Sequence, residues 1–131
     1  MRTNLKRILL VDDEAVITRL LKINLEETQN YIVQVENSAA SALEVGERFH
    51  PDLIVLDIMM PHLDGGALAQ LFKESAVLKD VPVVFLTAAV TKAEVSSMGG
   101  RIGGLPFMAK PLDIPEVIAC IEKCIGAPQP L

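Results

Sequence analysis

Two uninterrupted apolar runs constrain the fold of this chain more than any other feature. Ile8–Val11 and Leu53–Leu56 lack polar residues and are rich in β-branched side chains. Such short runs are typical of strands buried on both faces of a parallel sheet. Carboxylates follow both runs at once, Asp12 and Asp13 after the first and Asp57 after the second. Because burying an unpaired carboxylate is costly, each acid is expected where its strand leaves the core.

The remaining sequence alternates between strand-like and helix-like patterns. Apolar residues spaced three or four apart predict amphipathic helices, and short β-branched runs between turn residues predict strands. Ser38 is a candidate N-cap, and Asp113 and Glu116 form a candidate capping pair for a last helix that ends at Gly126. The predicted strands are residues 8–11, 31–35, 53–56, 81–87 and 107–109, and the predicted helices are residues 14–28, 38–48, a segment around 68–72, and 114–125.

The weakest predicted element is a fourth helix near Lys92–Ser97. Four glycines follow it closely, at positions 99, 100, 103 and 104. Each glycine in a helix interior costs about 1 kcal/mol relative to alanine. This helix is therefore expected to be short or frayed.

The alternation of five strands with helices predicts an α/β fold, a flavodoxin-like (βα)5 doubly wound parallel sheet. Right-handed crossovers and the strand order 2-1-3-4-5 place the first and third strands side by side. Asp57 would then lie beside Asp12 and Asp13 at the carboxyl edge, where open parallel sheets bind ligands. We expect one domain over residues 1–126, with residues 127–131 as a tail or the start of a linker.

Composition narrows the classes of function. The net charge of −5 argues against direct binding to nucleic acid or to an anionic membrane. No apolar stretch is long enough to span a bilayer, and the N-terminus lacks the apolar core of a signal peptide. Cys120 and Cys124 lie four apart in a predicted helix, which suits neither a disulfide nor a zinc site, so we interpret them as small apolar residues on a helix flank. A cytoplasmic location is expected.

Two further residues complete a candidate site at the carboxyl edge. Thr87 ends the fourth predicted strand and Lys110 follows the fifth. Clustered carboxylates repel one another unless a cation neutralises them, and carboxylates with waters and a phosphate are typical ligands of Mg²⁺. A carboxylate can also attack phosphorus, while an ammonium and a hydroxyl stabilise the transferred group. Asp57, alone at its strand end, is the better nucleophile, and Asp12 with Asp13 is the better metal platform.

These residues resemble the receiver domain of two-component response regulators, and chemotaxis regulators in particular. The resemblance covers residues 6–125 and implies a phosphorylation-controlled signalling switch, which catalyses only its own phosphorylation and dephosphorylation. Five matching positions in the right order, each at a strand end, are more specific than any single motif. The matching segments are Val11–Glu14, Pro51–Pro61 with Asp64-Gly65, Thr87-Ala88 and Lys110-Pro111.

The resemblance implies a role for each site residue. Asp57 would be the phosphoacceptor. Thr87 and Lys110 would bind phosphoryl oxygens, and a cis peptide between Lys110 and Pro111 would aim the lysine inward. Mg²⁺, with Mn²⁺ as an alternative, would be held directly by Asp13, Asp57 and the backbone carbonyl of Met59, and by Asp12 through a metal-bound water.

The resemblance also implies a conformational switch. Thr87 would move toward the phosphoryl group and Phe107 would turn inward behind it, which would shift the surface formed by the fourth helix, fifth strand and fifth helix. A Phe107 that simply packs beside a strand is an alternative of equal weight. The implied partners are a histidine kinase or histidine phosphotransfer protein as donor, and an output domain or separate protein as target. Dimer formation on phosphorylation is a further alternative.

Four further residues bear on how the predicted switch would behave. Met59 and Ala89 occupy positions that tune dephosphorylation in the family, and because both are apolar we expect slow autodephosphorylation. His50 and His62 are interpreted as exposed loop residues.

Other functions compete with the predicted switch. A phosphorylation-independent adaptor of the same fold is one alternative. A Mg²⁺-dependent phosphohydrolase is another, but it usually needs a second acid where this chain has Met59. A flavin or nucleotide carrier would need a phosphate-binding loop where this chain has Asp-Asp-Glu.

Overall fold

The computed structural model describes residues 5–60, 63–87, 101–102, 105–110 and 112–126. Every predicted strand and helix within these ranges is present, and the fourth helix near Lys92–Ser97 lies outside them. In chain order the elements are β1 Lys6–Val11, α1 Ala15–Glu27, β2 Tyr31–Glu36, α2 Ala39–Phe49, β3 Leu53–Asp57, β4 Met59–Met60, β5 Leu63–Asp64, α3 Gly65–Glu74, β6 Val83–Thr87, β7 Arg101–Ile102, β8 Leu105–Ala109 and α5 Ile114–Ile125.

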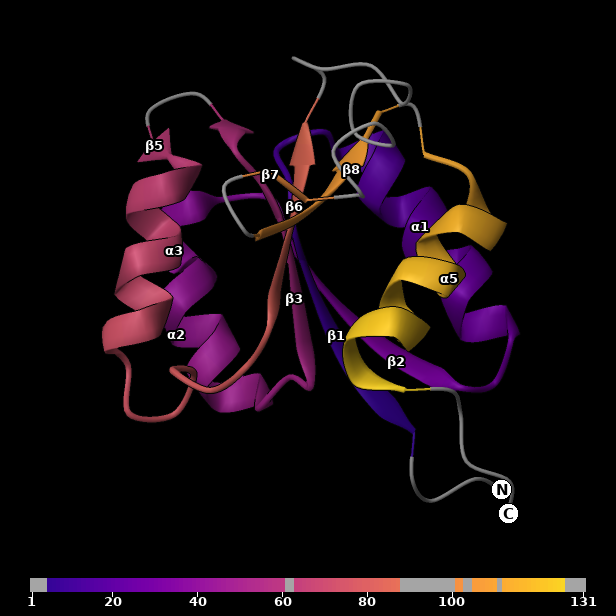
Figure 1. The fold of residues 1–131 in the computed structure, drawn as a ribbon, viewed down its shortest axis with the longest axis horizontal. Coiled ribbons are helices and arrows are strands. Elements are labelled where there is room, and N and C mark those ends of the chain that lie inside the picture. Colours follow the sequence, from indigo (N-terminus) through magenta and orange to yellow (C-terminus); the bar gives the residue numbers. More distant parts are fainter. Residues whose placement is uncertain (1–4, 61–62, 88–100, 103–104, 111, 127–131) are drawn as a thin grey trace.

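The central sheet has its parallel strands in the order β2-β1-β3-β6-β8. Counted over these five strands, this is the predicted order 2-1-3-4-5, so the flavodoxin-like topology is confirmed. Figure 1 shows the sheet between two helical layers, with α2 and α3 on one face and α1 and α5 on the other. Each β–α–β crossover places a helix over the sheet, and that coverage explains why the central strands are apolar throughout.

Alternate residues of the strands feed two separate cores. Ile8 and Leu10 of β1 face α1 and α5, where they join Val55 and Ile121. Leu9 and Val11 face α2 and α3 and belong to a cluster with Ile54, Leu56 and Phe72. Because successive side chains of a strand point to opposite faces, one unbroken apolar run supplies both cores. The sequence lacks Trp, and both cores are largely aliphatic.

Gly46 lets α2 pack closely on the sheet. A Cβ added there would lie 3.1 Å from a side-chain atom of Leu78 and 3.2 Å from one of Leu9. The helix ends at Phe49, and its C-cap His50 has a left-handed backbone (φ 55°) and donates its N–H to the carbonyl of Gly46 at 3.0 Å. His50 is exposed, as expected. The C-terminal turn of α2 is thus fixed against β1.

Several local predictions are wrong in detail. Ser38 and Asp113 occupy N-cap positions with extended backbone, but neither side chain makes a capping hydrogen bond. A small antiparallel pair, β4 with β5, was not among the predicted strands. The last strand starts at Leu105 and not at Phe107, because Leu105–Pro106 pairs with the antiparallel edge strand β7. Two-residue strands carry no periodicity that a sequence pattern could reveal.

The two cysteines behave as predicted. Cys120 and Cys124 are unbridged and partly buried on α5, where they pack against the core under α1 and α5. Among the described residues, none of the helices combines the length and the apolar character that a membrane span requires.

Candidate functional site

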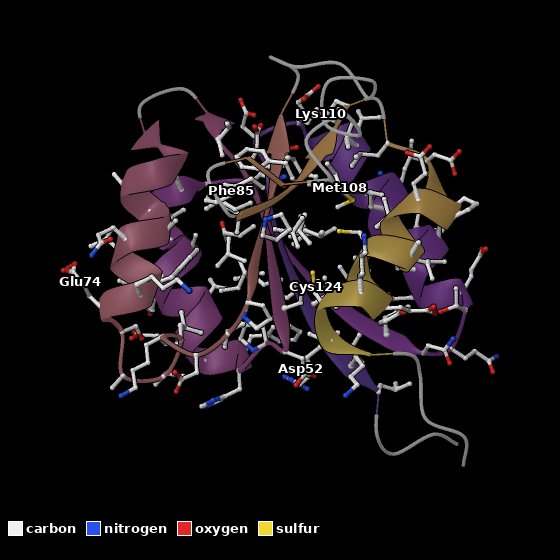
Figure 2. All side chains as sticks on the ribbon, viewed as in Figure 1. Asp52, Glu74, Phe85, Met108, Lys110 and Cys124 are labelled. Atoms are coloured by element: carbon white, nitrogen blue, oxygen red, sulfur yellow. The ribbon has the colours of Figure 1, made fainter. Side chains whose placement is uncertain are left out.

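The carboxyl ends of four neighbouring strands bring the predicted site residues to one edge of the sheet. Val11 lies opposite Leu56 and Asp57 lies opposite Leu86 in the parallel ladders. Thr87 in turn lies opposite Ala109, the residue before Lys110. Figure 2 shows Lys110 at this end of the sheet. The strand-end argument from sequence is therefore correct for the backbone of all these positions.

Asp12, Asp13 and Asp57 form the candidate metal centre. One carboxylate oxygen from each lies within 4.8 Å of the others. Opposite ligands of an octahedral Mg²⁺ lie about 4.2 Å apart, since each bond is about 2.1 Å long, so small side-chain movements would close the set on an ion. Asp12 and Asp57 are 1% and 3% exposed, whereas Asp13 faces solvent. The donor set, all oxygen and partly open to water, suits Mg²⁺ and equally Mn²⁺.

Lys110 links the acids. Its Nζ lies 2.8 Å from Asp12 Oδ2 and 3.3 Å from Asp57 Oδ2. It also lies 2.5 Å from Glu14 Oε1, an ion pair that sequence analysis did not anticipate. The signal was present, since Glu14 directly follows the acid pair, but its spacing to Lys110 in the sequence gives no hint of contact. One ammonium thus partly neutralises a cluster of four carboxylates.

The electrostatics of the site follow from burial. Desolvation raises the pKa of Asp12 to about 6, although hydrogen bonds from Lys110 and from the backbone of Glu14 oppose the rise. Burial alone would lower the pKa of Lys110. Its hydrogen bonds to Asp12 and Glu14 outweigh that effect and hold the pKa of the ammonium above its usual value. Lys110 is therefore cationic at neutral pH, while Asp12 is an acid that a cation would help to ionise.

The loop that carries the acid pair is held by Asn37, a second residue that the sequence analysis missed. Its side-chain amide donates to the carbonyl oxygen of Asp12 at 2.7 Å and to Thr18 Oγ1 at 3.0 Å. The backbone N–H of Glu14 donates to Asp12 Oδ1 at 3.0 Å. These bonds tie the end of β1 to α1 and to the residue that follows β2, which holds the carboxylate of Asp12 beside Asp57.

The structure describes only some of the residues predicted to form the switch or to flank the phosphorylation site. Phe107 is partly buried, and its ring stacks on Phe85, with centroids 5.0 Å apart and planes at 26°. Figure 2 shows Phe85 on the side of the sheet that α2 and α3 cover. Met59 belongs to β4, where its backbone pairs with Asp64. The side chain of Thr87, the peptide to Pro111, and the residues Ala89 and His62 lie outside the described part of the chain.

Comparisons with known proteins agree on one family. The family model for the response regulator receiver domain matches residues 8–122. The chain is 36% identical over 120 residues to the alkaline phosphatase synthesis transcriptional regulatory protein PhoP of Bacillus subtilis, covering 92% of this chain and 48% of that protein. It is 33% identical over 119 residues to the DNA-binding dual master transcriptional regulator RpaA of Synechocystis, covering 91% of this chain and 48% of that protein. The chain thus spans about half the length of these two relatives.

Other relatives match along nearly their whole length. The polar-differentiation response regulator DivK of Brucella ovis is 29% identical over 122 residues, covering 92% of this chain and 97% of that protein. The chemotaxis protein CheY4 of Vibrio cholerae superposes with a TM-score of 0.78 at 20% identity, covering 92% of this chain and 99% of that one. A Pseudomonas aeruginosa sensor kinase receiver domain, with magnesium coordinated in its active site cleft, gives a TM-score of 0.77 at 24% identity, covering 95% and 100%. These structural likenesses support the fold.

Proposed function

Because the chain belongs to the response regulator receiver domain family, we propose that it is a signalling switch in which Asp57 accepts a phosphoryl group. One observation carries the proposal. The nearly buried carboxylate of Asp57 has an ammonium 3.3 Å away and two further carboxylates beside it that could share a cation. A nucleophile, a counter-charge for the incoming oxygens and a cation site then converge at one edge. A domain of this kind changes state and does not turn over a substrate.

The chemistry assigned to the chain is an in-line phosphoryl transfer. An oxygen of Asp57 forms a bond to phosphorus as the phosphorus–nitrogen bond of the donor breaks. A phosphohistidine that is protonated at its other ring nitrogen takes up the electron pair of that bond and leaves as a neutral imidazole. Lys110 supports the equatorial oxygens through its ammonium, and the hydroxyl of Thr87 would donate a further hydrogen bond. Mg²⁺, held by Asp13, Asp57 and the carbonyl of Met59, with Asp12 bound through a water, would neutralise charge on the carboxylates and the phosphoryl oxygens. A cis peptide before Pro111 would help to aim Lys110.

The proposed response starts at Thr87. Its movement toward the phosphoryl group would leave space beside β6, and Phe107, now stacked on Phe85, lies on the neighbouring strand β8. Rotation of the Phe107 ring into that space would alter the proposed output surface, which is formed by the predicted fourth helix, β8 and α5. A separate target protein or an output domain would read this change. PhoP and RpaA are about twice as long as this chain, which leaves room for a second domain in those two relatives.

The proposed donor is a histidine kinase or a histidine phosphotransfer protein. Val16, Leu20 and Ile23 form an apolar stripe on α1 and are 73%, 55% and 46% exposed. The stripe begins two residues after Glu14, so a helix docked there would lie close to Asp57. The unbridged cysteines fit a reducing compartment, and we place the exchange in the cytoplasm.

Phosphorylation by a small acyl phosphate tests the proposal. With Mg²⁺ present, intact mass should rise by one phosphoryl group, and chelation of the metal should abolish the gain. Asp57→Asn should prevent it, while Asp80→Asn, a change to an exposed carboxylate, should not. A folded wild-type protein that never gains the phosphoryl group would favour the adaptor alternative, and turnover of an ordinary phosphomonoester would favour a phosphohydrolase.

A further inference from the structure

A concave site lies at the opposite end of the sheet from the acid cluster. Its cavity of about 340 Å³ lies between the start of β1, the outer strand β2 and the last turn of α2. Figure 2 shows Asp52, which marks this end, far from Lys110. Asp52 is bonded to the backbone of Arg7, where it donates at 2.7 Å and accepts at 2.8 Å. The lining residues are Arg7, Gln34, Val45, Arg48 and Phe49.

Arg7 is preorganised within this cavity. Its Nε donates to the carbonyl oxygen of Phe49 at 2.8 Å, and its guanidinium lies over the Phe49 ring at 4.2 Å from the centroid. In the described part of the chain, the terminal Nη groups have no hydrogen bond or ion pair. A guanidinium that is fixed at one nitrogen and stacked on a ring keeps its remaining donors available in a fixed orientation, with little side-chain entropy left to lose.

The rest of the lining complements Arg7. Arg48 in the last turn of α2 is exposed and makes no ion pair with any described residue, and Gln34 of β2 offers an exposed amide. Val45 and Phe49 form an apolar wall that continues into the core under α2 and α3. None of the described residues that line the cavity is acidic, although the chain carries a net charge of −5. Two unneutralised guanidinium groups at one cavity in an acidic protein call for an anionic ligand.

We infer that this cavity binds a small organic phosphate, with the phosphate between Arg7 and Arg48 and an apolar body against Val45 and Phe49. A phosphate monoester is close to a dianion at pH 7, which matches the two guanidinium charges. A cavity of about 340 Å³ is at the small end of ligand pockets, so its size suits a compact ester, whereas inorganic phosphate alone would leave the apolar wall uncovered. This inference does not depend on phosphorylation of Asp57.

Phenyl phosphate is the probe, followed by ¹H–¹⁵N NMR on the full chain without Mg²⁺. Saturable shifts should centre on residues 7, 34 and 45–49, while inorganic phosphate and benzyl alcohol should each bind at least about tenfold more weakly. Arg48→Gln should weaken phenyl phosphate at least about tenfold. The matched control Arg19→Gln, on the exposed face of α1, should leave binding unchanged. Arg7→Lys should also weaken binding, because it keeps the charge and loses the planar pair of donors.

Three outcomes of the phenyl phosphate titration would overturn the inference. They are shifts confined to the neighbourhood of Asp57 and Lys110, equal binding by the Arg48→Gln and wild-type proteins, and an absence of saturation up to about 10 mM ligand. A glutamate-rich peptide that binds in an Arg48-dependent way, while phenyl phosphate does not, would also overturn it and would assign the cavity to a protein partner. Since Arg48 is exposed and its side chain makes no hydrogen bond or ion pair with a described residue, its variant separates loss of binding from loss of structure.

Discussion

The ammonium of Lys110 and a bound cation would act on the same carboxylates. Nζ of Lys110 lies 2.8 Å from Asp12 Oδ2, and removing its positive charge should strengthen the attraction of the cluster for Mg²⁺. At an effective dielectric constant near 20, a unit charge about 5 Å from a divalent ion is worth several kcal/mol before solvent and salt reduce it. Lys110→Gln should therefore tighten Mg²⁺ binding by about tenfold while it slows phosphorylation.

Calorimetric titration measures this effect directly. The control is Lys79→Gln, which removes an exposed lysine that does not belong to the acid cluster and should leave Mg²⁺ affinity unchanged. Equal affinities for wild type and Lys110→Gln would mean that the lysine does not share the site with the ion.

The buried hydroxyl of Tyr31 should destabilise the fold. The residue is 3% exposed, and its hydroxyl has no hydrogen-bond partner among the described residues. Tyr31→Phe should therefore raise the free energy of unfolding by about 1 kcal/mol, since an unsatisfied buried group is lost at little cost in packing. Urea unfolding at pH 7 measures the difference, and a destabilised variant would show that the hydroxyl has a partner after all.

The same residue predicts a pH dependence. Burial, and then the carboxylate of Glu122, raise the pKa of Tyr31 above its usual value of 10.0. A raised folded-state pKa means that this group's contribution to stability is complete below the unfolded pKa and is lost as pH rises through the folded pKa. Wild type should thus lose more stability than Tyr31→Phe between pH 9 and pH 11, as followed by urea unfolding at each pH.

At the scale of the element, α1 presents a face that nothing in the described chain covers. Val16, Leu20 and Ile23 lie at helical spacing on that face. Leu20→Glu preserves helix propensity and should leave phosphorylation by a small acyl phosphate unchanged, but it should slow transfer from a histidine phosphotransfer protein at least about tenfold. Leu71→Glu on α3, also at an exposed leucine, is the control. Equal slowing by both donors would place the defect in the chemistry and not in docking.

The outer edge of β2 is protected by α1. The N–H of Val33 donates to Glu26 Oε2 at 2.9 Å, and the carbonyl oxygen of Val33 accepts from Lys22 Nζ at 2.7 Å. Lys22 and Glu26 are themselves an ion pair on α1, so this pair binds both backbone polar groups of Val33. Replacing Lys22 and Glu26 together by Ala should lower the free energy of unfolding by about 1–2 kcal/mol and promote self-association through the freed edge.

Urea unfolding and concentration-dependent light scattering test this role of α1. The control replaces Arg19 and Glu27, two exposed charges of the same helix, by Ala. Matching behaviour of the two double variants would show that the edge contacts contribute nothing beyond surface charge.

The elements also show where sequence reasoning ends. Apolar runs that stop at polar residues located Asp57, Thr87 and Lys110 at strand ends, because an apolar run ends where its strand reaches the edge of the sheet. The runs did not reveal that Asp57 stays buried there, at 3% exposed. Ser38 and Asp113 do lie at the predicted N-cap positions, but neither side chain makes the capping bond, because a backbone can adopt the cap conformation without it.

Contacts between distant segments escaped the sequence altogether. The pairing of Glu14 with Lys110, and the guanidinium of Arg7 over the ring of Phe49, join residues far apart in the chain. No periodicity encodes such contacts, since they arise only when the parallel sheet brings its strand ends together. Asn37 belongs to the same class, because its bond to Asp12 spans two strands of the sheet.

At the scale of the whole molecule, metal binding and folding should be coupled through Asp12. In the metal-free protein burial raises the pKa of Asp12 from 3.8 to about 6. The contribution of this group to stability is therefore complete below about pH 3.8 and is lost as pH rises through about 6, at most about 3 kcal/mol in all. Mg²⁺ at 100 times its Kd adds about 2.7 kcal/mol, but only to molecules whose acids are ionised.

The stabilising effect of Mg²⁺ should consequently depend on pH. Thermal unfolding with Mg²⁺ or with chelator should differ little at pH 5 and by about 2–3 kcal/mol at pH 8. Asp12→Asn should flatten the pH dependence of the chelated protein, since it carries no group to ionise, while Asp80→Asn should not. A Mg²⁺ effect of the same size at pH 5 and pH 8 would separate the ion from Asp12, and the acid cluster would then contribute to the fold and to the site through different carboxylates.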